Sequence, residues 1–214
     1  MLKSIWKVML AVLIFSVFHS LAASRPAQEL AARQFGRRQR NAFYRLFFLG
    51  QSVLTLAALF AYIRPLPDRV FYRLKGPLAL VMRLGQLSGI VYAAWSAYEV
   101  GLPGILGIRS LLSWEQKERC VPAEPEAQGP SALGESLRVS GPFRFHRHPL
   151  NFSPLPVFWL NPVMTAKLLA FNLVASLYLL LGSVHEETRL LAAYGDRYRD
   201  YQESGIPFFF PKFS

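Results

Sequence analysis

The sequence predicts an all-α protein, a polytopic membrane helix bundle of about five transmembrane helices with a cytoplasmic C-terminal amphipathic helix. Two observations predict this class. First, 52% of the 214 residues are hydrophobic, although the chain also carries 24 Lys and Arg and a net charge of +11. Second, the two kinds of residue are segregated, because long apolar blocks alternate with basic connections. The blocks lie at 4–24, 42–63, 78–100 and 150–184. We therefore expect a single integral membrane domain over 1–214.

The positive charge narrows the classes of partner. Basic residues beside spanning helices contact membrane lipids that carry anionic headgroups. They form no separate basic domain, so we do not expect a nucleic-acid partner, which is the rival interpretation of so basic a chain. Cys120 is the single cysteine, which excludes an intramolecular disulfide and a cysteine-based zinc site, and no metal site is predicted. The composition does not specify an oligomeric state.

The first apolar block has two interpretations. Lys3 and Lys7, the apolar run and the sequence "LAAS" resemble a cleavable signal peptide. Trp6 interrupts that pattern, and a cluster of arginines follows that opposes translocation. The cluster comprises Arg25, Arg33, Arg37, Arg38, Arg40 and Arg45. The sequence therefore favours a retained helix.

The arginine cluster also predicts the orientation of the N-terminal helices, which occupy 1–110. If the cluster lies on the cytoplasmic side of a bacterial inner membrane, the N-terminus lies outside and the C-terminus is cytoplasmic. The second connection does not fit this scheme, because it is predicted to lie outside and is nevertheless basic. Its basic residues are Arg64, Arg69, Arg73 and Lys75. The stretch "RVFYRLKG" has an alternative interpretation as an interfacial amphipathic segment.

Two further segments complete the spanning part. The segment 115–140 is rich in Pro, Glu and Gly, which predicts a flexible cytoplasmic loop. The block 150–184 has about 35 residues, and roughly 20 residues cross the apolar core once, so it is long enough to fold back on itself. Asn161-Pro162 supplies the break. We expect a hairpin with a short first limb and an external turn.

The chain after 184 is predicted to continue as an amphipathic helix into the cytoplasm. Residues at spacings of three and four share one of its faces. They are Glu187, Leu191, Tyr194, Tyr198 and Tyr201. Gly195 lies in the middle and costs about 1 kcal/mol relative to alanine, which indicates close packing at that point. The tail "IPFFFPKF" is interpreted as an interfacial aromatic anchor.

Two polar clusters flank the predicted hairpin. One is the loop Arg144–Asn151, with Arg147-His148-Pro149 at its centre, and the other is the pair Glu186-Glu187. Both ends of a hairpin return to the same side of the membrane. We therefore expect the two clusters to lie close together, although nearly forty residues separate them in the sequence. Taken separately, each cluster is also explained by headgroup contacts or solvation. Together, ionisable groups at the ends of membrane helices indicate a functional site.

These residues resemble the C-terminal signature of the membrane methyltransferases that include isoprenylcysteine carboxyl methyltransferase and the phospholipid N-methyltransferases. That signature is Arg-His-Pro-x-Tyr-x-Gly, an apolar span, paired glutamates and a helix of the type Gly-x-x-Tyr-x-x-Tyr. Here it corresponds to Arg147-His148-Pro149, Glu186-Glu187 and the segment from Gly195 to Tyr201. The resemblance covers 139–211 and is greatest to the methanethiol S-methyltransferase and NnrU-like branch.

The resemblance implies methyl transfer from S-adenosylmethionine, taken up from the cytosol, to a small or lipophilic acceptor. It makes 141–214 the cofactor-binding part. The residues implied at the reacting centre are Glu186, Glu187 and Arg144. The residues implied to bind the cofactor are Ser136, Leu137, Phe143, Arg147, His148, Pro149, Leu150, Asn151 and Tyr198.

Three departures from the signature bear on the activity. Asn151 replaces the motif tyrosine and Ser153 its glycine, which puts cofactor binding in doubt and leaves open a non-catalytic NnrU-like accessory protein. Gly182 stands where the isoprenylcysteine enzymes carry an arginine for the substrate carboxylate. This disfavours carboxyl methylation and leaves a thiol, an amine or another lipophilic acceptor. A third alternative is an NADPH-linked membrane reductase, whose related pattern has an asparagine directly after the proline. It ranks lower, because Asn151 comes two residues after the proline here.

Overall fold

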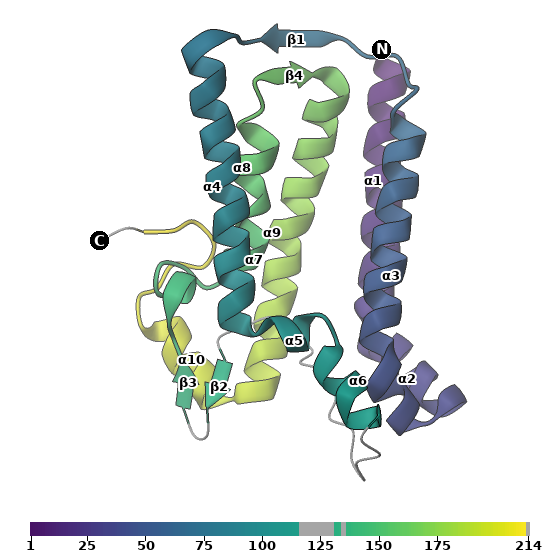
Figure 1. Ribbon diagram of the computed structural model, residues 1–214, viewed down its shortest axis with the longest axis vertical. Coiled ribbons are helices and arrows are strands. Elements are labelled where there is room, and N and C mark those ends of the chain that lie inside the picture. The colour runs from purple at the N-terminus through teal and green to yellow at the C-terminus, as the bar shows by residue number, and fades with distance from the viewer. Residues whose placement is uncertain (116–130, 134–135, 213–214) are drawn as a thin grey trace. The chain divides into compact units, whose positions relative to one another are not determined.

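A computed structural model describes residues 1–115, 131–133 and 136–212. The predicted class is confirmed, since the described chain is a helical polytopic membrane fold (Figure 1). It divides into two compact units. Unit 1 comprises Met1–Arg69 and Leu102–Pro125, and unit 2 comprises Val70–Gly101 and Glu126–Ser214. Most of the predicted loop 115–140 lies outside the described residues; within it, the short strands β2 (Ser131–Leu133) and β3 (Ser136–Arg138) pair antiparallel.

Four helices of the described chain are long and apolar enough to cross a membrane, where the sequence predicted about five. They are α1 (Leu2–Ala23), α3 (Arg37–Ile63), α4 (Gly76–Val100) and α9 (Ala166–Tyr194). The missing one is the first limb of the predicted hairpin. It consists of two short helices, α7 (Pro149–Phe152) and α8 (Pro154–Trp159).

Prolines explain the short limb. Pro154 has no N–H to donate, so the hydrogen bonds of α7 end before it and α8 begins, although Ser153 itself keeps a helical conformation. Together the two helices rise only about 16 Å, at 1.5 Å per residue. The chain nevertheless reaches the N-terminal end of α4. There β4 (Val163–Thr165) pairs antiparallel with β1 (Val70–Arg73), which directly precedes α4. The stretch predicted as an interfacial amphipathic segment is therefore partly a strand that fixes the hairpin turn.

In unit 1, α1 packs against α3 through a stripe of small residues. The buried residues of α1 recur every fourth position, at Ser4, Val8, Val12 and Ser16. After α1, the amphipathic helix α2 (Arg25–Phe35) begins at Ser24, whose hydroxyl accepts a hydrogen bond from the Ala27 amide. The short helices α5 (Leu102–Ile105) and α6 (Ile108–Glu115) follow, and α6 packs against the first turns of α3.

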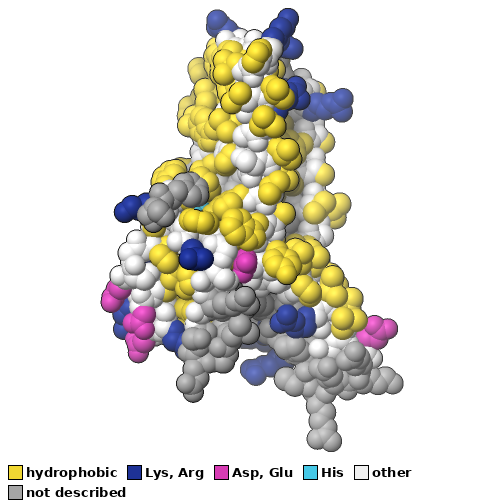
Figure 2. All heavy atoms as spheres, turned by 60° about the vertical axis from the view of Figure 1, so that its left-hand side comes forward, with side chains coloured by type: hydrophobic (Ala, Val, Ile, Leu, Met, Phe, Trp, Pro, Cys, Tyr) yellow, Lys and Arg dark blue, Asp and Glu magenta, His cyan; other side chains and the backbone are white. Residues whose placement is uncertain are grey.

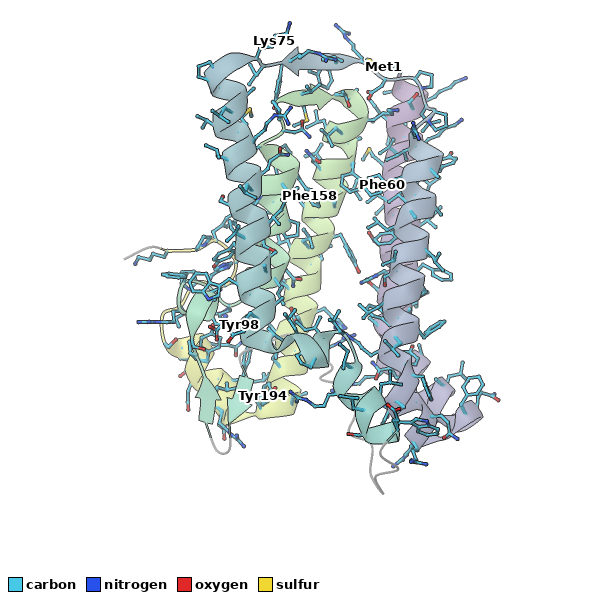
Figure 3. The ribbon with its side chains drawn as sticks, in the orientation of Figure 1. Met1, Phe60, Lys75, Tyr98, Phe158 and Tyr194 are labelled. Carbon is cyan, nitrogen blue, oxygen red and sulfur yellow. The ribbon has the colours of Figure 1, made fainter. Side chains whose placement is uncertain are left out.

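In unit 2, α8 lies directly against α4 because α4 presents glycines to it. A Cβ on Gly89 would come within 3.0 Å of the Ser153 carbonyl oxygen. The Gln86 amide donates to the Val157 carbonyl oxygen across the same contact. Figure 3 shows Lys75 and Tyr98 near opposite ends of α4 and Phe158 on α8. On the face shown in Figure 2, hydrophobic side chains dominate the upper part, and the visible acidic side chains lie in the lower part.

The C-terminal helix differs from the prediction. It does not run on from the spanning helix, because α9 ends at Tyr194 and α10 (Asp196–Glu203) begins after Gly195. Gly195 has φ +59°, and a Cβ there would meet nothing within 4 Å. Close packing is therefore not the reason for this glycine. It permits a backbone conformation that lets the chain turn and α10 fold back on α9.

Candidate active site

The loop that carries Arg147-His148-Pro149 is anchored to α4. The 3-10 helix η1 (Gly141–Arg144) leads into it, and directly before η1 the Ser140 hydroxyl donates to Glu99 at 2.6 Å. His146 is fully buried, stacks on the ring of Tyr92, and its Nε2 lies 2.8 Å from the Tyr92 hydroxyl. Phe152 packs edge-on against the same imidazole. These contacts fix the loop beside α4 before α7 begins.

Glu187 is the centre of the polar cluster, and its carboxylate is filled by donors. Oε1 accepts from Arg147 Nε at 2.9 Å and from the Tyr198 hydroxyl at 2.9 Å, and it lies 2.8 Å from His148 Nε2. Oε2 accepts from Arg147 Nη2 at 3.4 Å and from the Gln202 amide. A carboxylate offers about four lone-pair sites. Glu187 therefore joins the loop, α9 and α10.

Glu186 has a different surrounding. Its Oε2 accepts from the Asn151 amide at 3.0 Å and lies 3.3 Å from His148 Nδ1. The same amide donates to the Ser183 hydroxyl at 2.9 Å. Asn151 therefore links α7 to two positions of α9 that are one turn apart. The side chain of Glu186 remains 16% exposed.

His148 lies between the two carboxylates. Each ring nitrogen faces one of them, and both can receive a proton only from the imidazolium form. Burial lowers the pKa of His148, but the hydrogen bonds to Glu186 and Glu187 outweigh this effect and raise it above its ordinary value. The imidazolium and Arg147 then balance the two carboxylates in charge.

A small aromatic core supports the cluster from behind. Tyr198, Tyr201 and Leu190 are buried together, and Leu137 packs against them. The Tyr201 hydroxyl donates to the Phe143 carbonyl oxygen at 2.6 Å. Burial is the largest cause that raises the pKa of both tyrosines, so the hydroxyls stay protonated donors. The helix α10 is thereby tied to the loop as well as to α9.

The C-terminal tail, predicted as an interfacial anchor, instead packs on the loop. Arg147 donates from its amide to the Pro207 carbonyl oxygen at 2.9 Å and from Nη1 to the Ile206 carbonyl oxygen at 3.0 Å. Phe208 lies edge-on to His148, with ring centroids 5.1 Å apart. The tail is therefore held on the loop by defined hydrogen bonds and a ring contact, which its run of aromatic residues did not predict.

The structure brings together seven of the predicted site residues: Arg147, His148, Pro149, Asn151, Glu186, Glu187 and Tyr198. The other predictions fall elsewhere. Phe143 is buried, and Leu137 packs in the aromatic core. Arg144 is exposed and has no contact with the cluster among the interactions found in the described chain. Leu150 lies in α7, half-buried, and the Ser136 side chain is outside the described part.

Sequence reasoning missed three contributors. Ser183 precedes Glu186 by three residues and Gln202 follows Tyr198 by four, so helical spacing alone places each on the correct face. The pairing of Tyr92 with His146 had no such signal, because 54 residues separate them. It depends on the loop lying against α4, which only the tertiary structure shows.

Fold and site together define a class: a polytopic membrane protein in which an Arg-His-Pro loop meets paired glutamates at one end of a spanning helix. Comparison with curated proteins agrees. Methanethiol S-methyltransferase 1 of Bradyrhizobium diazoefficiens is 26% identical over 91% of this chain and 63% of that protein. Methanethiol S-methyltransferase 2 of the same species is 29% identical over 93% of this chain and 70% of that protein.

A shorter match is closer in sequence. The methanethiol S-methyltransferase of Mycobacterium tuberculosis is 45% identical over 60 residues, which are 28% of this chain and 25% of that protein. The chain spans less than two-thirds of the first relative's length. No family model and no solved structure matches it. The chain is a distant homologue of proteins named methanethiol S-methyltransferase, which confirms the resemblance to the isoprenylcysteine carboxyl methyltransferase superfamily and to that branch.

Proposed function

We propose that this chain is a membrane-embedded methyltransferase that uses S-adenosylmethionine to methylate a small thiol. The observation that carries the proposal is the contact between His148 of the Arg-His-Pro loop and the pair Glu186-Glu187. These are the two parts of the signature, which lie far apart in the sequence. The relatives support it, because those aligned over most of the chain carry the name methanethiol S-methyltransferase. We further propose that the site faces the cytosol, where the cofactor is made.

The donor set suits a cationic cofactor. Bound S-adenosylmethionine supplies an activated methyl group on a positively charged sulfonium. Glu186 offers a carboxylate whose position is fixed by Asn151 and His148. The side chains that would hold the cofactor are His148 and Asn151, together with Leu150 in the same turn. Asn151 takes the place of the signature's tyrosine and still presents an amide at the site.

The chemistry asks for alignment, exclusion of water and a deprotonated nucleophile. Glu186 is proposed to accept the proton of the thiol and to balance positive charge beside it. His148 and Asn151 are proposed to hold that carboxylate in place. Glu187 is proposed to act only through this positioning, since its oxygens are filled by structural donors. Phe208 covers one edge of His148 and shields it from water.

Gly182 supports a thiol over a carboxylate acceptor. It lies one turn before Glu186, and a Cβ there would meet nothing within 4 Å. The position that carries an arginine in the isoprenylcysteine enzymes therefore has room for a larger side chain but holds no cation. A carboxylate substrate would lack a counter-charge at this point, whereas a thiol needs none.

The test gives purified protein labelled S-adenosylmethionine with, separately, a small thiol, phosphatidylethanolamine and farnesylcysteine. We expect transfer to the thiol. Glu186→Gln should lower turnover by at least about tenfold and leave cofactor binding largely intact, because a proton acceptor acts mainly in the transition state. Asn151→Tyr should preserve or tighten binding, whereas His148→Ala should weaken it.

Three outcomes would contradict the proposal. Transfer to farnesylcysteine alone would overturn the argument from Gly182. Absence of cofactor binding by both the wild type and Asn151→Tyr would favour a non-catalytic accessory protein. Binding of NADPH in place of S-adenosylmethionine would favour a reductase.

A further inference from the structure

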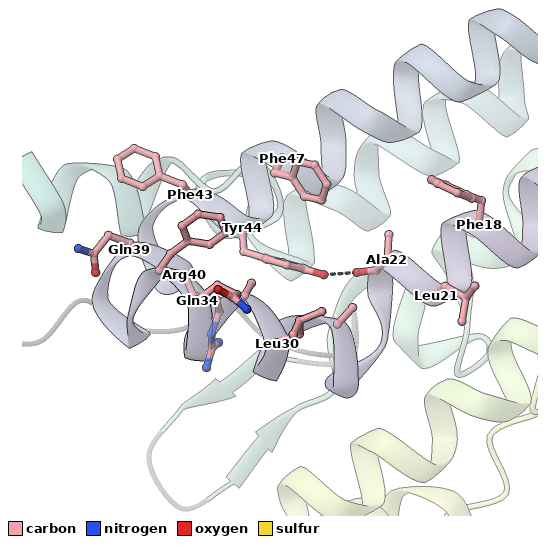
Figure 4. A pocket seen from close by; sticks show the side chains of 13 residues that line it. Phe18, Leu21, Ala22, Leu30, Gln34, Gln39, Arg40, Phe43, Tyr44 and Phe47 are labelled. Atoms are coloured by element: carbon pink, nitrogen blue, oxygen red, sulfur yellow. Dashed lines mark hydrogen bonds between the residues drawn. The ribbon is translucent and has the colours of Figure 1, made fainter.

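Unit 1 contains a large apolar cavity that the proposed activity does not use. It has a volume of about 900 Å³ and lies between the end of α1, the helix α2 and the start of α3 (Figure 4). Its lining is dominated by large apolar side chains. They include Phe18, Leu21, Leu30, Phe35, Phe43 and Phe47. The volume is at the upper end of the range for small-molecule sites, about 300–1,000 Å³, and is far more than a small thiol needs.

A second apolar cavity lies farther along α1 and α3. It has a volume of about 410 Å³ and shares Phe18 with the first. It extends along α3 as far as Tyr62. Tyr62 follows Arg40 by 22 residues, or about 33 Å of helix at 1.5 Å per residue. The two cavities follow one another along α1 and α3, and both are lined mainly by apolar side chains, which suits successive parts of an extended hydrocarbon chain.

One end of the first cavity is polar and basic. In Figure 4, Gln39 and Arg40 lie at the end away from Phe18. Arg45 donates to the Ile105 carbonyl oxygen and Arg38 lies over the Trp114 ring. In contrast, Arg40 Nε is buried without an acceptor in the described part of the chain. The surrounding segment 25–45 holds six arginines and one acidic residue, Glu29.

The position of α2 places this end at a membrane surface. The helix is amphipathic, and its lining residues Ala27, Leu30, Ala31 and Phe35 recur at spacings of three and four. Leu30 and Phe35 are 60% and 70% exposed. Tyr44 closes the inner side, since its hydroxyl donates to the Ala22 carbonyl oxygen at 2.7 Å. An apolar groove that opens beside a basic surface at headgroup depth matches a lipid with a negative headgroup.

We propose that the groove between α1, α2 and α3 binds one anionic phospholipid, with its phosphate at Arg40 and an acyl chain that runs past Phe18. This site is independent of the proposed methyl transfer. The amphipathic helix supplies the outer wall, and the arginines select the headgroup.

The experiment measures lipid retained by the full chain in detergent, by native mass spectrometry. The probes are phosphatidylglycerol and phosphatidylethanolamine with identical acyl chains. We expect the wild type to retain phosphatidylglycerol about fivefold better, from one guanidinium at the headgroup. Arg40→Gln should bring the ratio close to one. Arg64→Gln, at the opposite end of α3, is the matched control and should leave the ratio unchanged.

A second pair of variants tests the groove itself. Ala31→Trp fills the cavity and should reduce retention of both lipids, whereas Ala32→Trp, which does not line it, should not. Melting in lipid-free detergent checks that both variants fold. Equal retention of the two lipids by the wild type, or equal effects of the two tryptophans, would overturn the proposal. Stabilisation by inorganic phosphate alone would also overturn it, since the acyl chain would then be unnecessary.

Discussion

At the scale of single residues, the two glutamates show what a sequence can and cannot distinguish. The pair is adjacent, and the signature marks both as functional. The fold separates them, because Glu187 faces α10 and the tail whereas Glu186 faces Asn151. This difference in partners depends on the turn at Gly195, which brings α10 back to Glu187. The helical periodicity of the sequence runs through Gly195 and did not predict the turn. The sequence therefore predicted that the two carboxylates lie near the loop, but not that they contact different partners.

Removing the charge of Glu187 should destabilise the fold. Glu187→Gln keeps the shape but removes the counter-charge of Arg147 and leaves His148 with Glu186 alone. Loss of one partner of a largely buried ion pair costs about 3 kcal/mol. The measurement is denaturant unfolding in detergent. The matched variant Glu186→Gln should cost much less, because it breaks no contact with Arg147. Equal losses of stability would show that both carboxylates are structural.

A second prediction concerns acid sensitivity at His146. The pKa of His146 is lowered to about 4, chiefly by burial; the Phe209 backbone opposes this effect and the nearby His148 adds to it. The unfolded chain takes up this proton near pH 6.5, so it binds more protons than the folded state between pH 6.5 and 4. Stability should therefore fall as the pH falls through this window, by about 2 kcal/mol at pH 5.

The check on His146 is a comparison of His146→Gln with the wild type at pH 7 and pH 5. Glutamine cannot take up a proton, and its carbonyl can still accept from Tyr92. The variant should lose less stability on acidification. His148 acts in the opposite sense, since its raised pKa adds stability that is fully present below pH 6.5 and is lost as the pH rises through the folded value. An unchanged pH dependence in the variant would contradict the role of His146.

At the scale of elements, spans were predictable and their partners were not. The apolar blocks gave α1, α3, α4 and α9 because length and hydropathy are local properties. The first hairpin limb failed as a full helix because its prolines stop the helix within a few residues. The close contact of this short limb with α4 depends on Gly89, which lets the limb's backbone approach, and on Gly85, which makes room for the Leu160 side chain. Two glycines in an apolar block did not reveal that contact.

Gly89 should be intolerant of even a methyl group. A Cβ would lie 3.0 Å from the Ser153 carbonyl oxygen and 3.1 Å from Pro156 Cβ, so α8 must shift. Gly89→Ala should destabilise the protein by about 1–3 kcal/mol, as overpacking of an interior does. Gly182→Ala is the control in the same unit, where the new methyl has space and helix propensity improves by about 1 kcal/mol. Comparable melting temperatures for the two variants would show that α4 and α8 are less closely packed than described.

At the scale of the whole molecule, charge segregation orders the chain across the membrane. The arginine cluster before and within α3 holds more basic residues than the connection before α4, so the positive-inside rule predicts that the N-terminus lies outside. Val70–Arg73 pairs with Val163–Thr165, so the second connection and the hairpin turn lie at the same end of unit 2. The basic residues of the second connection still count against the predicted orientation. Both sides of the predicted membrane protein carry basic residues, so the predicted orientation depends on which side carries more.

The last prediction concerns that orientation. In a Cys120→Ser background, single cysteines at Arg69 and Asn161 should react with a membrane-impermeant maleimide in intact cells, whereas one at Ser204 should react only after lysis. The physical reason is that β1 and β4 lie together at one end of α4 and α9, while α10 follows the opposite end of α9. Transport activity of the unmodified cells serves as a check on membrane integrity. Labelling of Ser204→Cys in intact cells would put the candidate site outside, away from a cytosolic cofactor. Opposite labelling of Arg69→Cys and Asn161→Cys would show that the strand pair does not form in the membrane.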